Sequence, residues 1–354
     1  MSADRIPVRD DLVDVVPYGA PQLDVPVRLN TNETPFRPPQ AFFDLLAKRV
    51  AALDLHRYPD RRATELRTEL GRRFGLPTDR VWAANGSNEI LQQLLQAYGG
   101  PGRTLLVFRP GYSMYPLLAK VTNTDVTTFD LDHGRYLDAG LARAAVETER
   151  PEIVFVASPN NPTGIPVPLK AIRALHDHSE ALVVVDEAYV EFGAESAVSL
   201  LGELPRLVVC RTFSKAWRLA GLRLGYLLAH DWVIDDLRKV RLPYHLDTLT
   251  QAAGLVALEL ADDVTAHIAT LVDERERMVA AMRAISQIEV WEESRGNFLL
   301  FWSAVPDLFD RLLDKGVLVR DFSTQPLLEG CLRVSVGTPS ENDTFLTALR
   351  ECVL

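Results

Sequence analysis

Residues 153–164 read IVFVASPNNPTG, and residues 182–189 read LVVVDEAY. Each stretch begins with an unbroken apolar run and ends in polar residues. A strand that is apolar throughout, without alternation, is typical of a sheet with helices on both faces. Such sheets bind their ligands at the carboxyl ends of the strands. These two stretches therefore predict an α/β fold with a functional site just beyond residues 157 and 186.

The sequence on either side continues this pattern. Further apolar runs at 105–108, 207–210 and 226–229 alternate with amphipathic segments that favour helices, such as 87–98 and 170–180. The alternation predicts a mostly parallel central sheet in a large domain. The domain boundaries must then lie outside this alternating region.

The two ends of the chain have a different texture. Beyond residue 231 the helical patterns lengthen, with one expected helix over 263–284, and short strands follow, including one over 317–320. Six prolines between residues 17 and 39 exclude a regular helix there and predict an extended arm. We therefore expect three parts: an arm over 1–45 that packs on the small domain and the cleft, a large cofactor-binding domain over 46–238, and a small α+β domain over 239–354.

Composition excludes several classes of protein. The chain has 354 residues, of which 47% are hydrophobic, and a formal net charge of -10. These values exclude general disorder and argue against partners with a phosphate backbone, such as nucleic acids, and against anionic membrane surfaces. No apolar run approaches the ~18 residues of a membrane span. The three scattered cysteines suggest neither disulfides nor a metal site, so we expect a cytoplasmic protein.

The stretch Asn85–Glu89 stands where an apolar helix is expected to begin. Gly86 allows close backbone approach, Ser87 is expected to cap the helix, and Asn88 follows in its first turn. Free N–H groups at a helix start bind phosphate, although a plain helix cap explains the same residues. The glycine patterns of dinucleotide and nucleoside-triphosphate sites are absent, which argues against a nicotinamide dehydrogenase.

Two strand ends carry side chains suited to holding an aromatic ligand. Asn161 lies in a stiff turn between two prolines, directly after the strand 153–157. Asp186 ends an apolar strand, so its carboxylate needs a cationic or protonated partner, for which a pyridinium nitrogen is suited. A helix-capping role is the alternative for this aspartate.

Lys215 follows the strand 207–210 and is flanked by Ser214 and aromatic residues. Burial at such a place lowers the pKa of a lysine and favours a Schiff base with a carbonyl compound. Arg223 lies between two glycines and is expected to bind a phosphate together with Ser214 and Thr212.

These four motifs occur in an order that resembles the fold-type I aminotransferases, which use pyridoxal 5′-phosphate (PLP). The resemblance implies that Asn161 contacts the phenolic oxygen of PLP, that Asp186 pairs with the ring nitrogen, and that Lys215 forms the Schiff base. Lys215, Asp186 and Tyr189 are then the expected catalytic residues. The other implied contacts are with the phenolic oxygen from Tyr189, with the ring face from Tyr112, and with the phosphate from Gly86, Ser87, Asn88, Thr212, Ser214 and Arg223.

Other segments are similar to the histidinol-phosphate aminotransferase branch of that family. They read RYPD at 57–60, LVRD at 318–321 and LRVSVG at 332–337. The resemblance implies a homodimer in which Tyr58 reaches the cofactor phosphate of the partner subunit. The substrate-binding residues that it implies are Tyr18, Asn32, Arg320 and Arg333. The implied reaction converts histidinol phosphate and 2-oxoglutarate into imidazole-acetol phosphate and glutamate, a step of histidine biosynthesis.

Two departures from the pattern of that branch leave the substrate open. Phe36 follows the expected substrate segment where tyrosine is usual, and Trp217-Arg218 stands after the lysine where a plainer run is common. An aromatic amino acid (phenylalanine) aminotransferase and a threonine-phosphate decarboxylase of the same fold are the alternatives. Arg218 is expected to be a solvated surface residue, and the alternative is an additional cation near the phosphate end.

Overall fold

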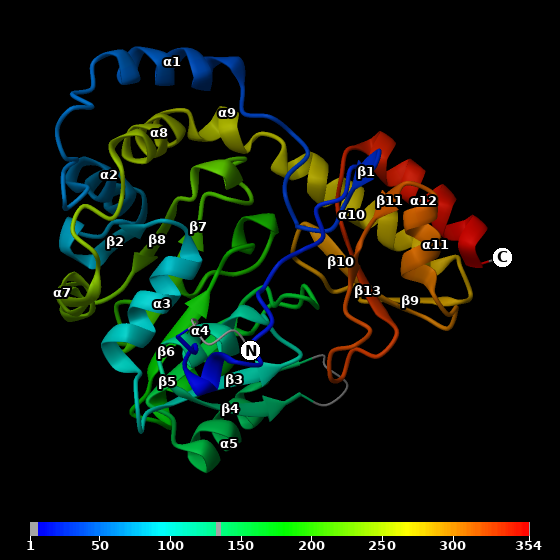
Figure 1. Ribbon diagram of the computed structural model, residues 1–354, viewed down its shortest axis with the longest axis horizontal. Coiled ribbons are helices and arrows are strands. Elements are labelled where there is room, and N and C mark those ends of the chain that lie inside the picture. Colours follow the sequence, from blue (N-terminus) through cyan, green and yellow to red (C-terminus); the bar gives the residue numbers. More distant parts are fainter. Residues whose placement is uncertain (1–5, 132–135, 354) are drawn as a thin grey trace.

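The computed structural model describes residues 6–131 and 136–353 of the chain. The first five residues of the expected arm and the last residue of the expected small domain lie outside this range. Figure 1 shows a larger body built around one sheet and a smaller body beside it, with the N-terminal segment running between the two. No helix of the described residues is long and apolar enough to cross a membrane.

A seven-stranded sheet forms the centre of the larger body, in the order β2-β8-β7-β6-β5-β3-β4. Its strands run parallel except β8, which is antiparallel to both of its neighbours. This confirms the predicted α/β class with a mostly parallel sheet. The strands are β2 (Val81–Ala84), β3 (Thr104–Arg109), β4 (Asp125–Asp130), β5 (Ile153–Ala157), β6 (Leu182–Asp186), β7 (Leu207–Thr212) and β8 (Gly225–Leu228).

The central strands are apolar throughout because the sheet separates two cores. Within β6, Val183 and Val185 belong to one apolar cluster, whereas Leu182 and Val184 belong to the other. Helices α2, α5, α6 and α8 contribute to the first cluster, and α3, α4 and α7 to the second. The edge strand β4 is covered less, and most of its residues are exposed. Burial on both faces therefore explains the absence of alternation in β5 and β6.

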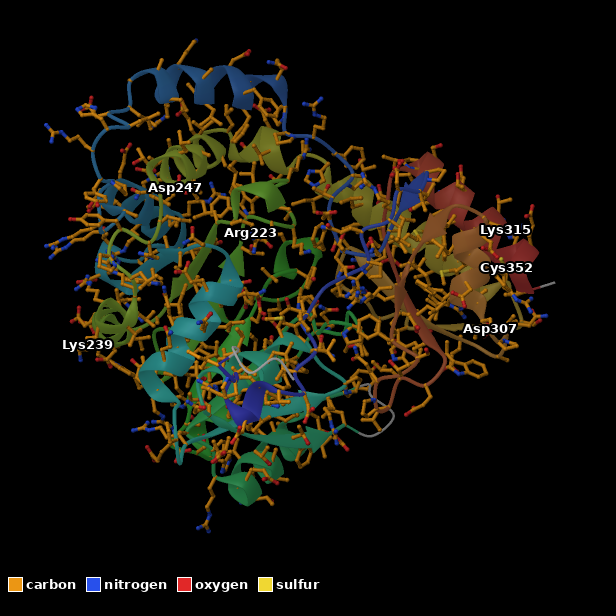
Figure 2. All side chains as sticks on the ribbon, viewed as in Figure 1. Arg223, Lys239, Asp247, Asp307, Lys315 and Cys352 are labelled. Atoms are coloured by element: carbon orange, nitrogen blue, oxygen red, sulfur yellow. The ribbon has the colours of Figure 1, made fainter. Side chains whose placement is uncertain are left out.

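Helices of the larger body begin and end where the sequence supplies suitable groups. The Asp247 carboxylate accepts the N–H of Thr250 at 2.8 Å and starts α8 (Figure 2), while α2 ends at Gly75 in a left-handed conformation. The helices of this body are α1 (Gln40–Ala51), α2 (Thr64–Phe74), α3 (Ser87–Tyr98), α4 (Met114–Val121), α5 (Ala139–Glu149), α6 (Leu169–Asp177), α7 (Asp231–Val240), α8 (Thr248–Glu259) and α9 (Ala261–Thr265).

The smaller body pairs an antiparallel sheet, in the order β12-β13-β10-β9, with three helices. Figure 1 shows α10 leading into it from α9. A short parallel pair joins the N-terminal segment to it, β1 (Val27–Arg28) with β11 (Val317–Leu318). The other elements are α10 (Ile268–Arg283), β9 (Ile288–Val290), β10 (Phe298–Ser303), α11 (Leu308–Asp314), β12 (Arg320–Asp321), β13 (Cys331–Ser335) and α12 (Pro339–Val353).

Two sequence expectations in this region were wrong. The helix expected over 263–284 is broken at Ala266–His267 into α9 and α10. The strand expected over 317–320 is two short strands, because Val317 and Leu318 pair with the N-terminal segment whereas Arg320 and Asp321 pair with β13. Both differences arise from contacts with distant parts of the chain, which local periodicity does not report.

Candidate active site

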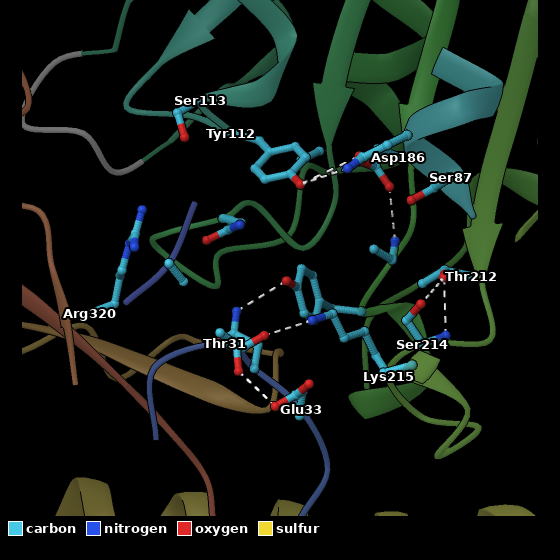
Figure 3. Close-up of a pocket in the computed structure, with 18 of the residues that line it drawn as sticks. Thr31, Glu33, Ser87, Tyr112, Ser113, Asp186, Thr212, Ser214, Lys215 and Arg320 are labelled. Atoms are coloured by element: carbon cyan, nitrogen blue, oxygen red, sulfur yellow. Dashed lines mark hydrogen bonds between the residues drawn. The ribbon is translucent and has the colours of Figure 1, made fainter. Parts of the chain in front are cut away.

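A cavity of about 350 Å³ lies where the carboxyl ends of β5, β6 and β7 face the N-terminal segment and the smaller sheet (Figure 3). Gly86 and Tyr58 are the predicted site residues that do not line it. Gly86 lies directly before the lining residue Ser87. The predicted residues that line the cavity are Tyr18, Asn32, Ser87, Asn88, Tyr112, Asn161, Asp186, Tyr189, Thr212, Ser214, Lys215, Arg223, Arg320 and Arg333.

Lys215 lies in the loop after β7 and points toward the N-terminal segment (Figure 3). Its Nζ donates a hydrogen bond to the Thr31 carbonyl at 2.8 Å and lies 5.7 Å from the centre of the Tyr189 ring. Burial, reinforced by the nearby Arg333, lowers the pKa of Lys215 to about 7. An uncharged amine is therefore accessible near neutral pH, as a nucleophile or a proton acceptor requires.

Asp186 ends β6 at the floor of the cavity. Its Oδ2 accepts the Tyr115 hydroxyl at 3.0 Å, and its Oδ1 accepts the N–H of Ala188 at 3.2 Å. No cationic side chain of residues 6–131 or 136–353 forms an ion pair with it. Burial raises the pKa of Asp186 to about 6. A buried carboxylate without a cation favours a ligand that brings a proton or a positive charge to it.

Arg223 and two hydroxyl groups form one end of the cavity. Arg223 Nη1 donates to Ser214 Oγ at 3.2 Å, and Thr212 Oγ1 donates to the same oxygen at 3.0 Å. Gly86 suits this position because its φ is +84°, a conformation that other residues rarely adopt, and because a Cβ there would lie 2.8 Å from the Arg223 guanidinium. The first N–H groups of α3, which have no acceptor within the helix, belong to the same end. This donor set suits a phosphate group.

The start of α3 differs from the expected cap. The helix begins at Ser87, with Gly86 at the capping position and no bond from a capping side chain. The Glu89 carboxylate instead accepts the N–H of Asn85 at 2.6 Å. The expectation that Ser87 caps the helix is therefore wrong, and its hydroxyl is available to the cavity.

Aromatic side chains form one wall. The Tyr112 hydroxyl lies 3.4 Å from the side-chain amide of Asn88. The Tyr112 ring packs edge to face with the rings of Tyr18 and Tyr115, and the ring centres are 6.3 and 5.3 Å apart. Burial raises the pKa of the Tyr112 hydroxyl, which therefore stays protonated. These contacts fix the orientation of the Tyr112 ring beside the cavity.

Tyr189 is held by the N-terminal segment. Its hydroxyl accepts a hydrogen bond from Asn32 Nδ2 at 3.1 Å, and Asn32 Oδ1 accepts from Ser335 Oγ at 3.1 Å. Burial raises the pKa of Tyr189 to about 12. The side chain of Asn32 thus orients Tyr189, a contact that the sequence did not predict.

Arg333 is a buried cation without a carboxylate partner among the described residues. Its guanidinium lies 5.2 and 5.3 Å from the ring centres of Phe298 and Phe322. It donates to Asn161 Oδ1 and, at 2.8 Å, to the Asn30 carbonyl, while its Nε has no partner in the described part of the chain. Burial lowers the pKa of Arg333 to about 10. An anionic ligand supplies the charge that this guanidinium lacks.

Arg320 lies at the mouth of the cavity, half-buried, on β12. Its Nη1 donates to the Gly19 carbonyl at 3.1 Å, and its guanidinium lies 6.0 Å from the Tyr18 ring centre. Figure 3 shows it on the opposite side of the cavity from Thr212 and Ser214. The cavity therefore has cations at two ends, Arg223 at one and Arg320 with Arg333 at the other.

Tyr58 stands apart from these residues. It is 79% exposed and stacks on Tyr244, with ring centres 4.3 Å apart. The structure of one chain thus does not bring Tyr58 to the cavity that the other predicted residues share.

A second set of buried charges lies directly behind the site. Glu187 is 1% exposed, and its carboxylate accepts from Arg211 at 2.8 Å, from Ser196 Oγ and from the N–H of Ala197. The Glu191 carboxylate lies 4.0 Å from the same guanidinium. Glu187 thus has partners on several sides, unlike its neighbour Asp186.

Sequence reasoning missed Tyr115, Thr31 and Phe322. Tyr115 follows Tyr112 by three residues, and this spacing in the first turn of a helix was a usable signal for a second buried tyrosine. Thr31 acts through its carbonyl and Phe322 through its ring face, and neither role has a sequence signature. The described residues contain no group of three His, Cys, Asp or Glu side chains that could hold a metal ion.

Known proteins match this chain over nearly its whole length. The family model described as aminotransferase class I and II matches residues 25–349. A histidinol-phosphate aminotransferase of Mycobacterium avium is 49% identical over 98% of this chain and 88% of its own length. One from Corynebacterium diphtheriae is 48% identical over 99% of this chain and 98% of its own.

A solved structure is similar in fold. The histidinol-phosphate aminotransferase of Sinorhizobium meliloti, determined in complex with pyridoxal 5′-phosphate, has a TM-score of 0.88 to this chain. The match covers 99% of both chains at 24% sequence identity.

Proposed function

The chain belongs to the class I and II aminotransferase family, and on this premise we propose that it transfers an amino group between histidinol phosphate and 2-oxoglutarate. The products are imidazole-acetol phosphate and glutamate. This reaction is a step of histidine biosynthesis. The observation that carries the proposal is one cavity with a buried lysine between two cationic ends. One end suits a cofactor phosphate, and the other suits the anionic groups of both substrates.

The cofactor is PLP, and the side chains of the cavity fit it. The donor set of Arg223, Ser214 and the start of α3 matches a phosphate. Asp186, buried and without a cation, matches the ring nitrogen. Bound PLP supplies an aldehyde that captures the substrate amino group and a ring that delocalises the negative charge left when the Cα proton departs.

The chain's own residues then hold and move protons. With a pKa of about 7, the Lys215 amine is partly uncharged at neutral pH, so its Nζ can accept the Cα proton of the substrate and deliver that proton to the aldehyde carbon of the cofactor. The Asp186 carboxylate keeps a proton on the ring nitrogen, which strengthens the withdrawal of charge. Asn161 and Tyr189 hold the phenolic oxygen, and Tyr112 covers the ring.

The two substrates share the second cationic end. Arg333, buried between two phenylalanine rings, binds the α-carboxylate of glutamate, and its bond to Asn161 ties it to the cofactor side. Arg320, nearer the mouth, binds the phosphate of histidinol phosphate beside Tyr18. One site thereby accepts two substrates of different shape.

The active unit in this proposal is a homodimer. Tyr58 and Leu242 are 79% and 74% exposed, and Tyr58 stacks on Tyr244 in the same patch. Exposed aromatic and aliphatic side chains that lie together are typical of a protein interface. Tyr58 then contacts the cofactor phosphate in the partner's cavity. Mixing Tyr58→Phe with Lys215→Ala protein should regenerate parent-like sites, whereas no recovery would mean that each subunit is self-contained.

Division of the chain into an arm over 1–45, a large domain over 46–238 and a small domain over 239–354 is part of the proposal. The two sheets support it, because the first lies within 81–228 and the second within 288–335. The proposed location is the cytoplasm, since all three cysteines are buried and free.

The substitution Arg320→Ala tests whether histidinol phosphate is the substrate. A charge-assisted contact with a phosphate in a partly desolvated site contributes ~2–5 kcal/mol, so kcat/KM for histidinol phosphate should fall by about two orders of magnitude. The glutamate half-reaction should lose less and phenylalanine least. Arg350→Ala, an exposed arginine on α12, is the control. Stopped-flow measurement of each half-reaction separates the cases.

Three outcomes contradict the assignment. Equal losses for all three substrates would mean that Arg320 supports the fold or the cofactor. A loss confined to phenylalanine would indicate an aromatic aminotransferase. Release of carbon dioxide from threonine phosphate, with no amino transfer, would indicate the decarboxylase.

A further inference from the structure

Arg218 has a backbone conformation that its side chain does not favour. Its φ is +60°, in the left-handed region that glycine adopts freely and other residues adopt at a cost. It lies three residues after Lys215 in the same loop. Its backbone N–H donates a hydrogen bond to the Lys215 carbonyl. A non-glycine residue here is explained if its side chain makes contacts that offset the cost.

The side chain of Arg218 is half-buried and hydrogen-bonded to other segments, so the expectation of a solvated surface residue was wrong. Its Nε donates to His267 Nδ1 at 2.6 Å, and its Nη1 donates to the Arg37 carbonyl at 2.9 Å. The guanidinium lies 6.0 Å from the ring centre of Phe36, whose ring in turn lies 5.6 Å from the His267 imidazole. One side chain therefore joins three segments that are far apart in sequence.

One of these segments leads directly to the cavity, and another lies at the junction between the two bodies. Residues 30–33 line the cavity, and among them Thr31 accepts the Lys215 ammonium bond and Asn32 orients Tyr189. His267 lies in the break between α9 and α10, where the chain leaves the larger body for the smaller one (Figure 1). The third segment is the lysine loop itself.

We propose that Arg218 is a positioning residue that clamps the N-terminal segment 30–37 and the α9–α10 junction onto the lysine loop. The inference rests on the proposed function for its effect on substrate. Arg218 touches neither substrate nor cofactor in this account. It sets the position of the wall that carries Thr31 and Asn32.

The imidazole of His267 is suited to this role over the working pH range. Burial and the neighbouring Arg218 lower the pKa of His267 to about 4, so the ring stays neutral and its Nδ1 accepts the bond. The bond from Nη1 to a main-chain carbonyl does not depend on any titration. The clamp is therefore present throughout neutral pH.

Loss of the clamp should loosen the wall that carries Asn32, a proposed substrate-binding residue, while Lys215 and Asp186 remain on their own loop and strand. We therefore expect KM for histidinol phosphate to rise about threefold or more, while kcat changes less than about twofold. A residue with only a structural role would lower the fraction of folded protein and leave KM unchanged.

Amide hydrogen exchange of the holoprotein tests the clamp without any substrate. In Arg218→Ala, a peptide covering residues 29–37 should exchange about tenfold faster, because the hydrogen bond to the Arg37 carbonyl and the contact with the Phe36 ring are lost. A peptide covering β10 should exchange at the parent rate. Should alanine at this strained position fail to fold, Arg218→Gly adopts the conformation freely and also lacks the side chain.

Arg150→Gly is the matched control. Arg150 also has a left-handed conformation, with φ of +47°, and it is an exposed residue at the end of α5. Its replacement relieves the same backbone cost without removing a clamp, so exchange at 29–37 and KM should match the parent.

The proposal is overturned if exchange at 29–37 in Arg218→Gly stays within about twofold of the parent, or if Arg150→Gly accelerates it equally. Failure of the proposed function is distinguishable from this. A parent protein that does not use histidinol phosphate would refute the proposed function, while the exchange rates would still decide the role of Arg218.

Discussion

Asp186 and Glu187 are neighbours in the chain and are both buried, but their surroundings differ. Glu187 lies against Arg211, Ser196 and the N–H of Ala197, which together satisfy its charge. Asp186 has a tyrosine hydroxyl and one backbone N–H, and no cation among the described residues. A buried charge that is paired supports the fold, whereas one left without a cation is available to a ligand.

Lys215 and Arg333 belong with Asp186 in this contrast. Burial lowers the pKa of both basic groups, to about 7 and about 10. Asp186, Lys215 and Arg333 are thus three ionisable groups of the cavity that form no ion pair among the described residues, whereas Glu187 and Arg211 form one. Perturbed groups that gather in one cavity are typical of catalytic sites.

Lys215→Ala should have the largest effect. No other lysine lines the cavity in the described part of the chain, so amino transfer should fall by on the order of 10⁵-fold or more. The fold should persist, because the variant removes a buried cation without a carboxylate partner. Assay of glutamate formation and of unfolding by urea checks both parts. The control is Lys239→Ala, which replaces an exposed lysine on α7. Near-normal turnover by Lys215→Ala would show that Lys215 is not catalytic.

Glu187→Ala should be the most destabilising change in the paired region. It leaves the buried Arg211 with the more distant Glu191 as its carboxylate partner among the described residues, and breaking a buried pair costs about 3–5 kcal/mol of the free energy of unfolding. Urea unfolding measures it. Glu203→Ala breaks an exposed pair with Arg173 and should cost less than about 1 kcal/mol. Equal losses in the two variants would mean that the buried pair has no special weight.

In the cofactor-free protein, Asp186→Asn should raise the free energy of unfolding, whereas Glu187→Ala should lower it. The pKa of Asp186 is about 6 in the folded chain, above its ordinary 3.8, so ionisation of this group destabilises the fold as pH rises through 6. The variant should therefore be more stable than the parent by about 3 kcal/mol near pH 8 and equal to it below about pH 4. Unfolding curves across pH check this. A variant less stable near pH 8 would show that Asp186 is paired after all.

Tyr115→Phe should give the smallest effect. It removes one hydrogen bond to the Asp186 carboxylate, which should raise the pKa of that group by about one unit and lower kcat/KM about tenfold. Tyr98→Phe removes a similar bond to Asp236 on α7 and is the control. The pH dependence of the stability difference between parent and variant reports the shift. No shift would mean that Tyr115 only packs against the site.

Much of this contrast was predictable from sequence, because local patterns encode it. The unbroken apolar runs at 153–157 and 182–186 predicted the buried strands, and the polar residues after them lie around the cavity. Asp186 was recognised as a carboxylate in need of a partner. These inferences need only the neighbours of each residue in the chain.

The remaining features depend on distant contacts. Tyr115 lies 71 residues from Asp186, and the Thr31 carbonyl lies 184 residues from Lys215. The break at His267 and the side-chain contacts of Arg218 likewise involve the N-terminal segment. No periodicity or motif reports such pairs, so His267 was assigned to a helix interior and Arg218 to the surface.

A single-turnover reaction with histidinol phosphate tests whether Asp186 serves the reaction while Glu187 serves the fold. Parent, Asp186→Asn and Glu187→Gln should be compared as folded, cofactor-loaded protein, so that stability does not enter the rate. The account predicts that Glu187→Gln reacts within about threefold of the parent and that Asp186→Asn is slower by about 100-fold or more. A parent that transfers no amino group, or two variants that are slowed equally, would contradict it.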